Sequence, residues 1–422
     1  MIERIDWSIA SEARRRVALA RPRGRGDRTT IDAVRAIVED VARRGWDGLV
    51  EQARAIDNAV PERIAVAPFA AAARASLPAE AQDAMALAAA NIRAFHRATR
   101  PIDIEVETMP GLTVAKRWTA INRAGLYVPG GKAPLFSTLL MLAIPAEIAG
   151  VGRLTVVTPP RPGGGIDLAL ALAAEMCGID AIWAVGGAQA IAALAYGAGD
   201  IERVDLICGP GNKWVSAAKA LVASTPGGPG IDLPAGPSEL MVIADDSADP
   251  AVVAADLLGQ AEHDRDAQVI LVSPSAQLIE AVAVEFDRRA QAMGGDYAPA
   301  RAIRCTDLME AVNIANAYAP EHLSIACDGA KSLAKSVRNA GAVLAGHGAA
   351  ETFGDYLAGS SHVLPTDGAA RYTGGVSTTT FMKAITVQSV SRDAGRRLAA
   401  PAAALARLEG LEAHARSAEA RA

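Results

Sequence analysis

The sequence lacks the features that nucleic-acid-binding and membrane proteins share. Its 422 residues hold 42 lysines and arginines against 47 aspartates and glutamates, so the formal net charge at pH 7 is -5. A nucleic-acid-binding protein usually presents a basic face, and we therefore expect no nucleic-acid partner. No stretch of about 18 apolar residues, the length of a membrane span, is free of charges or helix breakers. The charged N-terminus also lacks the apolar core of a signal peptide, and we expect no membrane segment.

Cysteine and glycine motifs that define common cofactor sites are also missing. The cysteines at 177, 208, 305 and 327 lie far apart, so there is no CxxC zinc or redox motif. We interpret them as reduced, mostly buried thiols, which fits a cytoplasmic protein. No G-x-G-x-x-G fingerprint occurs, and GPGN at 209–212 has only its first two glycines. The spacing therefore does not predict a standard Rossmann cofactor site.

The length and the order of the apolar segments indicate an α/β protein with more than one core. A single core stops growing near roughly 250–300 residues, and this chain is longer. The first hundred residues place apolar side chains at helical spacing, at 29–54 and 78–100. From 111 to about 350, short apolar runs alternate with alanine-rich helical segments, which predicts mainly parallel sheets. The runs that we expect to be buried strands are 153–160, 181–187, 204–212, 239–245, 268–273 and 340–347.

Two segments indicate a change in organisation. Residues 224–238 are dense in glycine and proline, and we expect the chain to cross between domains there. Residues 383–422 are alanine-rich and only weakly hydrophobic. We expect this tail to be helical and to pack on another surface, such as a partner subunit.

The six histidines divide into two groups. His96 lies in a helical segment and His347 ends an apolar run, and we interpret both as structural. The others lie near acidic side chains and are candidates for function: His263, His322, His362 and His414.

Gln260, His263 and Asp355 form a candidate metal site. Gln260 and His263 are three residues apart on a predicted helix, so they share one face and can bind one ion. Asp355 follows a glycine turn and can add a carboxylate oxygen. Imidazole, amide and carboxylate ligands suit zinc and leave room for a substrate. An ordinary helix histidine explains the same spacing, so the pattern leaves both interpretations open.

Glu321 and His322 form a candidate catalytic pair. Side by side after Pro320, they are two proton-transfer groups that can serve one substrate. On an extended strand they would point to opposite faces, whereas a turn or a helix start after the proline lets both reach one pocket. The alternative is a helix N-terminus with a favourable acidic residue.

Seven long segments, in order, resemble the histidinol dehydrogenase family. They are GLYVPGGKAPLFSTLLMLAIPAEIAG (125–150), VGGAQAIAALAYG (185–197), GPGNKWV (209–215), DLPAGPSELMVIAD (232–245), DLLGQAEHD (256–264), YAPEHL (318–323) and GDYLAGSSHVLPT (354–366). The resemblance runs from about residue 30 to the C-terminus. Motifs of this length in this order do not arise by chance.

The resemblance implies an α/β fold with two incomplete Rossmann-like domains and mainly parallel sheets, in an intertwined homodimer. We expect a helical N-terminal arm at 1–25 and a domain with the zinc and catalytic residues at 26–126 and 239–375. The second Rossmann-like domain, at 127–238, would bind NAD. The helical tail, at 376–422, would pack on the partner subunit.

The resemblance also assigns functional residues. It places NAD near Tyr127, Gln189 and Asn212, and it makes Glu321 and His322 the catalytic pair. The implied ligands of one zinc ion per subunit are Gln260, His263, Asp355 and, from the partner subunit, His414. The implied substrate contacts are Ser238, Gln260, His263, His322, Asp355, His362, Glu409 and His414.

The reaction that this family implies oxidises L-histidinol to L-histidine through histidinaldehyde, with two NAD. These are the last steps of histidine biosynthesis. His322 would take the alcohol proton, and Glu321 would activate the water that attacks the aldehyde.

The chain departs from the family pattern at two places. Ser361 stands where an asparagine is common, and residues 370–383 differ from the usual sequence. An alternative is therefore a related zinc- and NAD-dependent dehydrogenase of another polar alcohol, such as a sulfonated diol. A third hypothesis is a zinc hydrolase or a binding module without redox turnover. The retained Glu409 and His414 favour histidinol.

Overall fold

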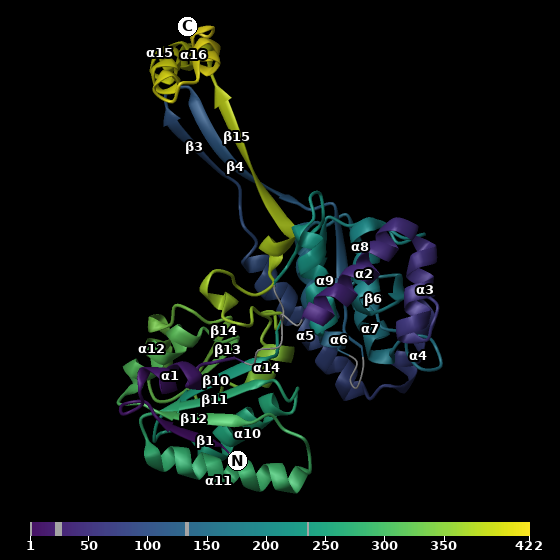
Figure 1. Ribbon diagram of the computed structural model, residues 1–422, viewed down its shortest axis with the longest axis vertical. Coiled ribbons are helices and arrows are strands. Elements are labelled where there is room, and N and C mark those ends of the chain that lie inside the picture. The colour runs from purple at the N-terminus through teal and green to yellow at the C-terminus, as the bar shows by residue number, and fades with distance from the viewer. Residues whose placement is uncertain (1, 22–27, 131–134, 234–235) are drawn as a thin grey trace.

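A computed structural model describes residues 2–21, 28–130, 135–233 and 236–422. Figure 1 shows two α/β units side by side and a narrow arm that projects away from both. No helix in the part of the chain that the structure describes has the length and apolarity needed to cross a membrane.

The first unit surrounds a parallel sheet, here the β10 sheet. Its order is β1 (Glu3–Asp6), β12 (Ala300–Arg304), β11 (Gln268–Ser273), β10 (Glu239–Ala244), β13 (His322–Ala326) and β14 (Ala342–Ala345). Every residue of β10 and β11 is buried, as their continuous apolar sequences predict. One face packs against α10 (Pro250–Ala261) and α11 (Ala276–Met293), the other against α1 (Glu12–Ala18) and α12 (Leu308–Tyr318). The short helices α13 (Ala330–Leu333) and α14 (Glu351–Tyr356) follow β13 and β14.

The second unit surrounds the β5 sheet. Its order is β2 (Glu62–Ala65), β7 (Ala181–Ala184), β6 (Arg153–Thr158), β5 (Arg123–Tyr127), β8 (Leu206–Cys208) and β9 (Gly230–Ile231), parallel except for β2. One face packs against α4 (Val66–Ser76), α5 (Ala79–Ala98), α6 (Phe136–Ala149) and α7 (Leu168–Met176). The other packs against α2 (Arg28–Arg44), α3 (Trp46–Asp57), α8 (Gly187–Tyr196) and α9 (Lys213–Ser224).

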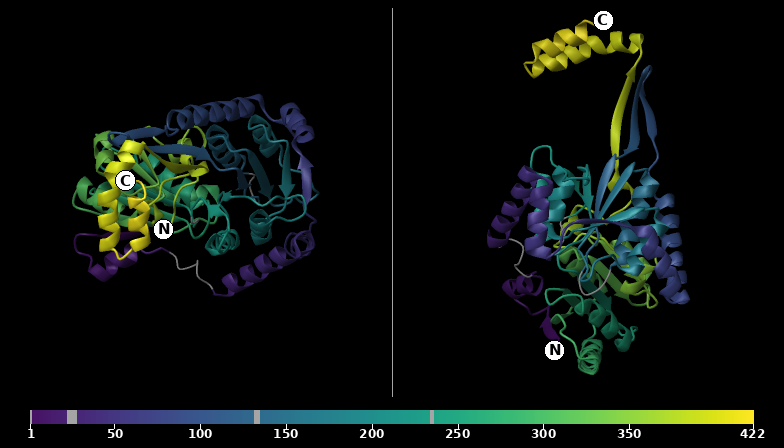
Figure 2. Two further views of the ribbon diagram at one scale, coloured as in Figure 1. Left: turned by 90° about the horizontal axis from the view of Figure 1, so that it is seen from above. Right: turned by 90° about the vertical axis from the view of Figure 1, so that its right-hand side faces the viewer.

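The arm is a three-stranded antiparallel ribbon that carries two helices at its tip (Figures 1 and 2). The strands are β3 (Ile104–Met109), β4 (Leu112–Ala120) and β15 (Met382–Val390), with β4 in the middle. The tip helices are α15 (Arg392–Leu408) and α16 (Glu412–Glu419). Three short 3-10 helices complete the described elements: η1 (Ala334–Ser336), η2 (Ala369–Arg371) and η3 (Thr378–Phe381).

The α/β class and the mainly parallel sheets are confirmed, and each of the six predicted runs contains a strand. The predicted burial is wrong for β14, none of whose residues is buried. The tail prediction is wrong over 382–390, which form β15 rather than a helix, because β4 supplies a strand partner. The domain division also differs. Residues 28–98 pack on the β5 sheet, since Val34, Ile64 and Ala70 join its cores. Residues 3–6 are an edge strand of the β10 sheet rather than part of a separate helical arm.

Candidate functional site

A cavity of about 180 Å³ lies where the two units meet. On the β10 side it is lined by Ser238, which precedes β10, and by His322, the first residue of β13. On the β5 side it is lined by Gly209, which directly follows β8. The cavity therefore lies at the amino ends of β10 and β13 and at the carboxyl end of β8. Of these, only the carboxyl end of β8 is the usual place for a ligand in a parallel α/β sheet.

Glu321 and His322 both line this cavity. Helix α12 ends at Tyr318, and Ala319 has a left-handed φ of 57° that turns the chain into β13. The positive φ lies before Pro320; after it the chain bends at Glu321 and enters β13 at His322, so the helix start considered from the sequence is absent. His322 Nδ1 lies 3.8 Å from Glu321 Oε2, so the turn brings both side chains to one place.

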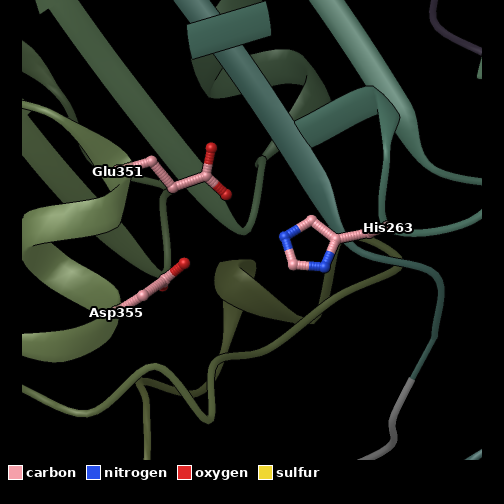
Figure 3. Close-up of side chains that lie close together, drawn as sticks. All are labelled: His263, Glu351 and Asp355. Atoms are coloured by element: carbon pink, nitrogen blue, oxygen red, sulfur yellow. The ribbon is translucent and has the colours of Figure 1, made fainter. Parts of the chain in front are cut away.

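His263, Glu351 and Asp355 form a cluster with the geometry to bind a metal ion. They offer ligand atoms that all lie within 4.8 Å of one another, and Figure 3 shows the three side chains facing a common centre. His263 follows the end of α10, and the other two belong to α14. Gln260, in the last turn of α10, is fully buried, and neither atom of its amide has a hydrogen-bond partner among the described residues. A bound metal ion would satisfy the oxygen of that amide.

The two groups are in direct contact. His322 Nδ1 lies 3.5 Å from Glu351 Oε1, and His322 Nε2 lies 3.5 Å from Asp355 Oδ1. The predicted His263, Asp355, Glu321 and His322 thus line one cavity, whereas Gln260 is not among its lining residues. Sequence reasoning missed Glu351, although its i, i+4 spacing to Asp355 on a short helix places both carboxylates on one face.

His362 and Ser361 play different parts beside the cavity. His362 is a lining residue that connects the two units, because its Nδ1 lies 2.9 Å from the Asp355 carbonyl oxygen and its Nε2 lies 3.1 Å from Thr138 Oγ1. Ser361 is buried, and its hydroxyl accepts a hydrogen bond of 3.1 Å from the backbone N–H of Val363. Ser361 is not among the lining residues, so the departure from asparagine lies outside the cavity wall.

Burial and charge shift the pKa values of this site strongly. Burial raises the pKa of Glu321 to about 7 and that of Glu351 to about 8. Burial lowers the pKa of His322, but the carboxylates of Asp355, Glu321 and Glu351 outweigh it and raise that pKa to about 9. Burial raises the pKa of Asp355, yet His322 brings it below its ordinary value. Closely spaced buried acids of this kind are typical of catalytic and metal sites.

A second cavity of about 580 Å³ adjoins the first and shares Ser238 and His263 with it. Asn212, the N-cap of α9, lines this larger cavity and accepts hydrogen bonds from the backbone N–H groups of Trp214 and Val215. The cavity is large enough for a substantial part of a dinucleotide.

The chain matches the family model for histidinol dehydrogenase over residues 21–422. A histidinol dehydrogenase of Xanthomonas euvesicatoria pv. vesicatoria is 45% identical over 419 residues, which cover 97% of each chain. Another, of Legionella pneumophila, is 41% identical and covers 99% of this chain and 97% of its own.

The chain belongs to the histidinol dehydrogenase family. A crystal structure of histidinol dehydrogenase from Elizabethkingia anophelis has the same fold, with a TM-score of 0.93 and 34% sequence identity. The match covers 100% of this chain and 98% of the other. The resemblance inferred from the motifs is thereby confirmed.

Two of the NAD contacts that the histidinol dehydrogenase resemblance implies lie behind the cavity walls. The Tyr127 hydroxyl accepts a hydrogen bond of 3.3 Å from the backbone N–H of Gly187. The Gln189 amide donates one of 2.9 Å to Asp57 Oδ2. Both side chains are buried, and neither lines the two cavities described above.

Glu409, an implied substrate contact, and His414, an implied zinc ligand, lie on the arm tip. Both are exposed, and Figure 1 shows the tip far from α14 and β13 of the same chain. A single chain therefore does not bring them to its own cavity.

Proposed function

We propose that this chain oxidises L-histidinol to L-histidine through histidinaldehyde, with NAD as hydride acceptor and one zinc ion per subunit, as the last steps of histidine biosynthesis. One observation carries the proposal: two proton-transfer groups, Glu321 and His322, lie beside a metal-binding cluster in one cavity. Membership of the histidinol dehydrogenase family supports the choice of substrate.

The donor set supports zinc. Imidazole, carboxylate and amide groups are ligands that Zn²⁺ accepts, and Gln260, His263 and Asp355 of this chain would bind it. Glu351 is close enough to join them. Burial raises its pKa to about 8 in the metal-free chain, and a bound cation would lower that pKa, because positive charge stabilises the ionised carboxylate. When bound, zinc would hold the imidazole and amine of the substrate and take no part in electron transfer.

The reaction requires two hydride transfers with the addition of water between them. In the first, hydride leaves the carbinol carbon for NAD⁺ while His322 takes the hydroxyl proton, which gives the aldehyde. Glu321 then takes a proton from water as the water oxygen adds to the aldehyde carbon, which gives the gem-diol. A second hydride leaves for another NAD⁺. In sum, histidinol, two NAD⁺ and water give histidine, two NADH and three protons.

The pKa values support this division of roles. A carboxyl with a pKa of about 7, such as Glu321, is present in both protonation states near neutral pH and suits a general base. The pKa of His322 is raised by three carboxylates. A cation bound by Asp355 would offset part of their charge and lower the pKa of His322 towards the range of a base.

We extend the proposal to an intertwined homodimer in which each arm tip completes the site of the other subunit. Leu405 is 65% exposed on the tip and Leu408 is 84% exposed, and apolar surface of this kind favours burial against another chain. The partner subunit's His414 would then be the fourth zinc ligand, and the partner subunit's Glu409 would contact the substrate ammonium.

The test is an NADH assay on the purified, zinc-loaded protein. With L-histidinol and NAD⁺ we expect two NADH and one L-histidine per histidinol consumed. No NADH from histidinol, together with turnover of a sulfonated diol, would replace the proposal by the related alcohol dehydrogenase. Bound zinc without NADH from any alcohol would favour a hydrolase or a binding module.

Two variants test the roles of single residues. His263→Asn should lose zinc, and an unchanged zinc content would remove His263 from the ligand set. Glu321→Gln should retain aldehyde formation and slow aldehyde oxidation, whereas an equal loss of both steps would refute its role in water activation.

A further inference from the structure

A buried carboxylate, Glu239, lies directly behind Glu321. The Glu239 backbone N–H donates to Glu321 Oε2 at 2.8 Å, and the Glu321 backbone N–H donates to Glu239 Oε2 at 3.4 Å. Glu239 Oε1 also accepts a hydrogen bond of 2.9 Å from the backbone N–H of Asp367. The Glu239 side chain is 1% exposed. The Glu239 carboxylate, at the start of β10, therefore connects that strand by hydrogen bonds to the turn before β13 and to the segment at Asp367.

Arg21 neutralises this carboxylate from the N-terminal segment. Its Nε lies 2.5 Å from Glu239 Oε1 and its Nη2 lies 2.8 Å from Glu239 Oε2, which is a bidentate ion pair. The same guanidinium stacks on the Tyr318 ring, 3.8 Å from its centroid. It also donates to the carbonyl oxygens of Tyr318 and Ala319, at 3.1 and 3.2 Å. Arg21 therefore contacts both the carboxylate behind Glu321 and the end of α12 that leads into Glu321.

We propose that Arg21 is a positioning residue for aldehyde oxidation, because through Glu239 and the end of α12 it holds the Glu321 carboxylate towards the cavity. The hydrogen bond from Glu239 occupies Oε2 and leaves Oε1 as the oxygen available to a reacting water. Without Arg21, Glu239 becomes a buried, unpaired charge close to the Glu321 carboxylate. Such a charge is not tolerated in place, so the two backbone hydrogen bonds that locate Glu321 are lost or rearranged.

This inference rests on the proposed function, and it separates the two chemical steps. His322 belongs to β13 and is held by the parallel ladder with β10, so the hydride transfer between alcohol and aldehyde should survive the loss of Arg21. The water-dependent step relies on Glu321, so its rate should fall when Arg21 is lost. A displacement of about 1 Å in a catalytic group lowers a rate by about 10- to 100-fold, and we expect Arg21→Met to slow aldehyde oxidation by that factor.

The two steps can be measured separately on zinc-loaded protein. Histidinaldehyde with NAD⁺ reports the water-dependent oxidation, and histidinaldehyde with NADH reports the reverse of the first step without water. Arg4→Met is the matched control. Arg4 also lies in the N-terminal segment and forms a bidentate ion pair with Glu280. This pair is on the surface, with side chains 46% and 60% exposed. Arg4→Met should change neither rate, and Arg21→Lys, which keeps the charge without the fork, should recover part of the oxidation rate.

The outcomes distinguish this inference from the proposed function. If the unchanged chain does not oxidise histidinol, the proposed function fails. If it does, selective loss of aldehyde oxidation in Arg21→Met, with normal zinc content and normal aldehyde reduction, supports the inference. Unchanged rates, or equal loss of both, would overturn it. If Arg21→Met does not fold, Glu239→Gln gives the second test, because it should show the same selective loss and a shifted pH profile for aldehyde oxidation only.

Discussion

The ion pair between Lys219 of α9 and Asp232 gives a prediction about stability. The two side chains are 2% and 1% exposed, and both line the cavity that contains Glu321. Together they hold Gly209, whose backbone N–H donates to Asp232 Oδ2 at 2.6 Å and whose carbonyl oxygen accepts from Lys219 Nζ at 2.8 Å. The pair therefore fixes the turn that follows β8. Without the ion pair, the β5 unit should unfold more easily.

The magnitude follows from burial. Removing one partner of a buried pair leaves an uncompensated charge and costs about 3–5 kcal/mol. We expect Lys219→Met to lower the free energy of unfolding by that amount. For a unit of this size, about 1 kcal/mol corresponds to roughly 2–4 °C in Tm, so Tm should fall by on the order of 10 °C. The double variant Lys219→Met/Asp232→Asn removes both charges and should be more stable than the sum of the single losses predicts.

The assay is urea unfolding followed by tryptophan fluorescence, since Trp46, Trp183 and Trp214 belong to the β5 unit. Arg74→Met is the control. It breaks an ion pair with Glu175 in the same unit, whose side chains are 56% and 40% exposed, and it should cost less than about 1 kcal/mol. A loss below about 1 kcal/mol in Lys219→Met, or strict additivity in the double variant, would refute the reasoning.

Three further predictions concern the site and the arm. The pKa values of Glu321, Glu351 and His322 are raised, so the metal-free folded chain holds protons that the unfolded chain releases. Its Tm should therefore fall from pH 6.5 to pH 9, and a Tm that rises over this range would contradict the assignment. Zinc should raise Tm more at pH 8.5 than at pH 6.5. Gly209→Ala should lower the free energy of unfolding by about 3 kcal/mol or more, because the φ of Gly209 is +125° and a Cβ would lie 2.0 Å from the Tyr127 carbonyl oxygen. Gly227→Ala is the control. Gly227 has a φ of +74° and nothing within 4 Å of its Cβ position, so this variant should cost about 1 kcal/mol in the same unfolding assay. If arms are exchanged, refolded mixtures of His414→Ala and Glu321→Gln chains should form L-histidine faster than either variant alone, because one site of each mixed dimer then has all its residues. Mixtures that form no more histidine than the single variants would count against exchange.

The fold was predictable where burial determines the sequence. The strands β10 and β11 are buried over their full length and read as continuous apolar runs. The strand β15 was not predictable, since eight of its nine residues are exposed and no buried face marks them. Its partner β4 lies far away in the sequence. The edge strand β1 is short and largely exposed, and it was missed for the same reason.

The site was predictable where its residues lie in compact motifs. Glu321–His322 and Gln260–His263 are local patterns, and the fold brings Glu321, His322 and His263 to one cavity. Arg21 and Glu239 are 218 residues apart, and neither residue type at its position indicates a contact. Lys219 also reads as an ordinary helix residue. Such pairs become visible only when the turns between distant strands are placed in space.

The ribbon of the arm joins strands that are synthesised far apart in time. Thr119 of β4 donates a hydrogen bond to the carbonyl oxygen of Lys383 in β15, and the two residues are 264 positions apart. At about 5–20 residues per second, the β3–β4 hairpin waits for its third strand for on the order of tens of seconds. During that time both sheets are completed, because the remaining strands of each lie between β4 and β15 except for β1 and β2. The tip with His414 follows the strands of both sheets in the chain. If arms are exchanged as proposed, a chain can therefore donate its tip only after both of its own sheets have been synthesised.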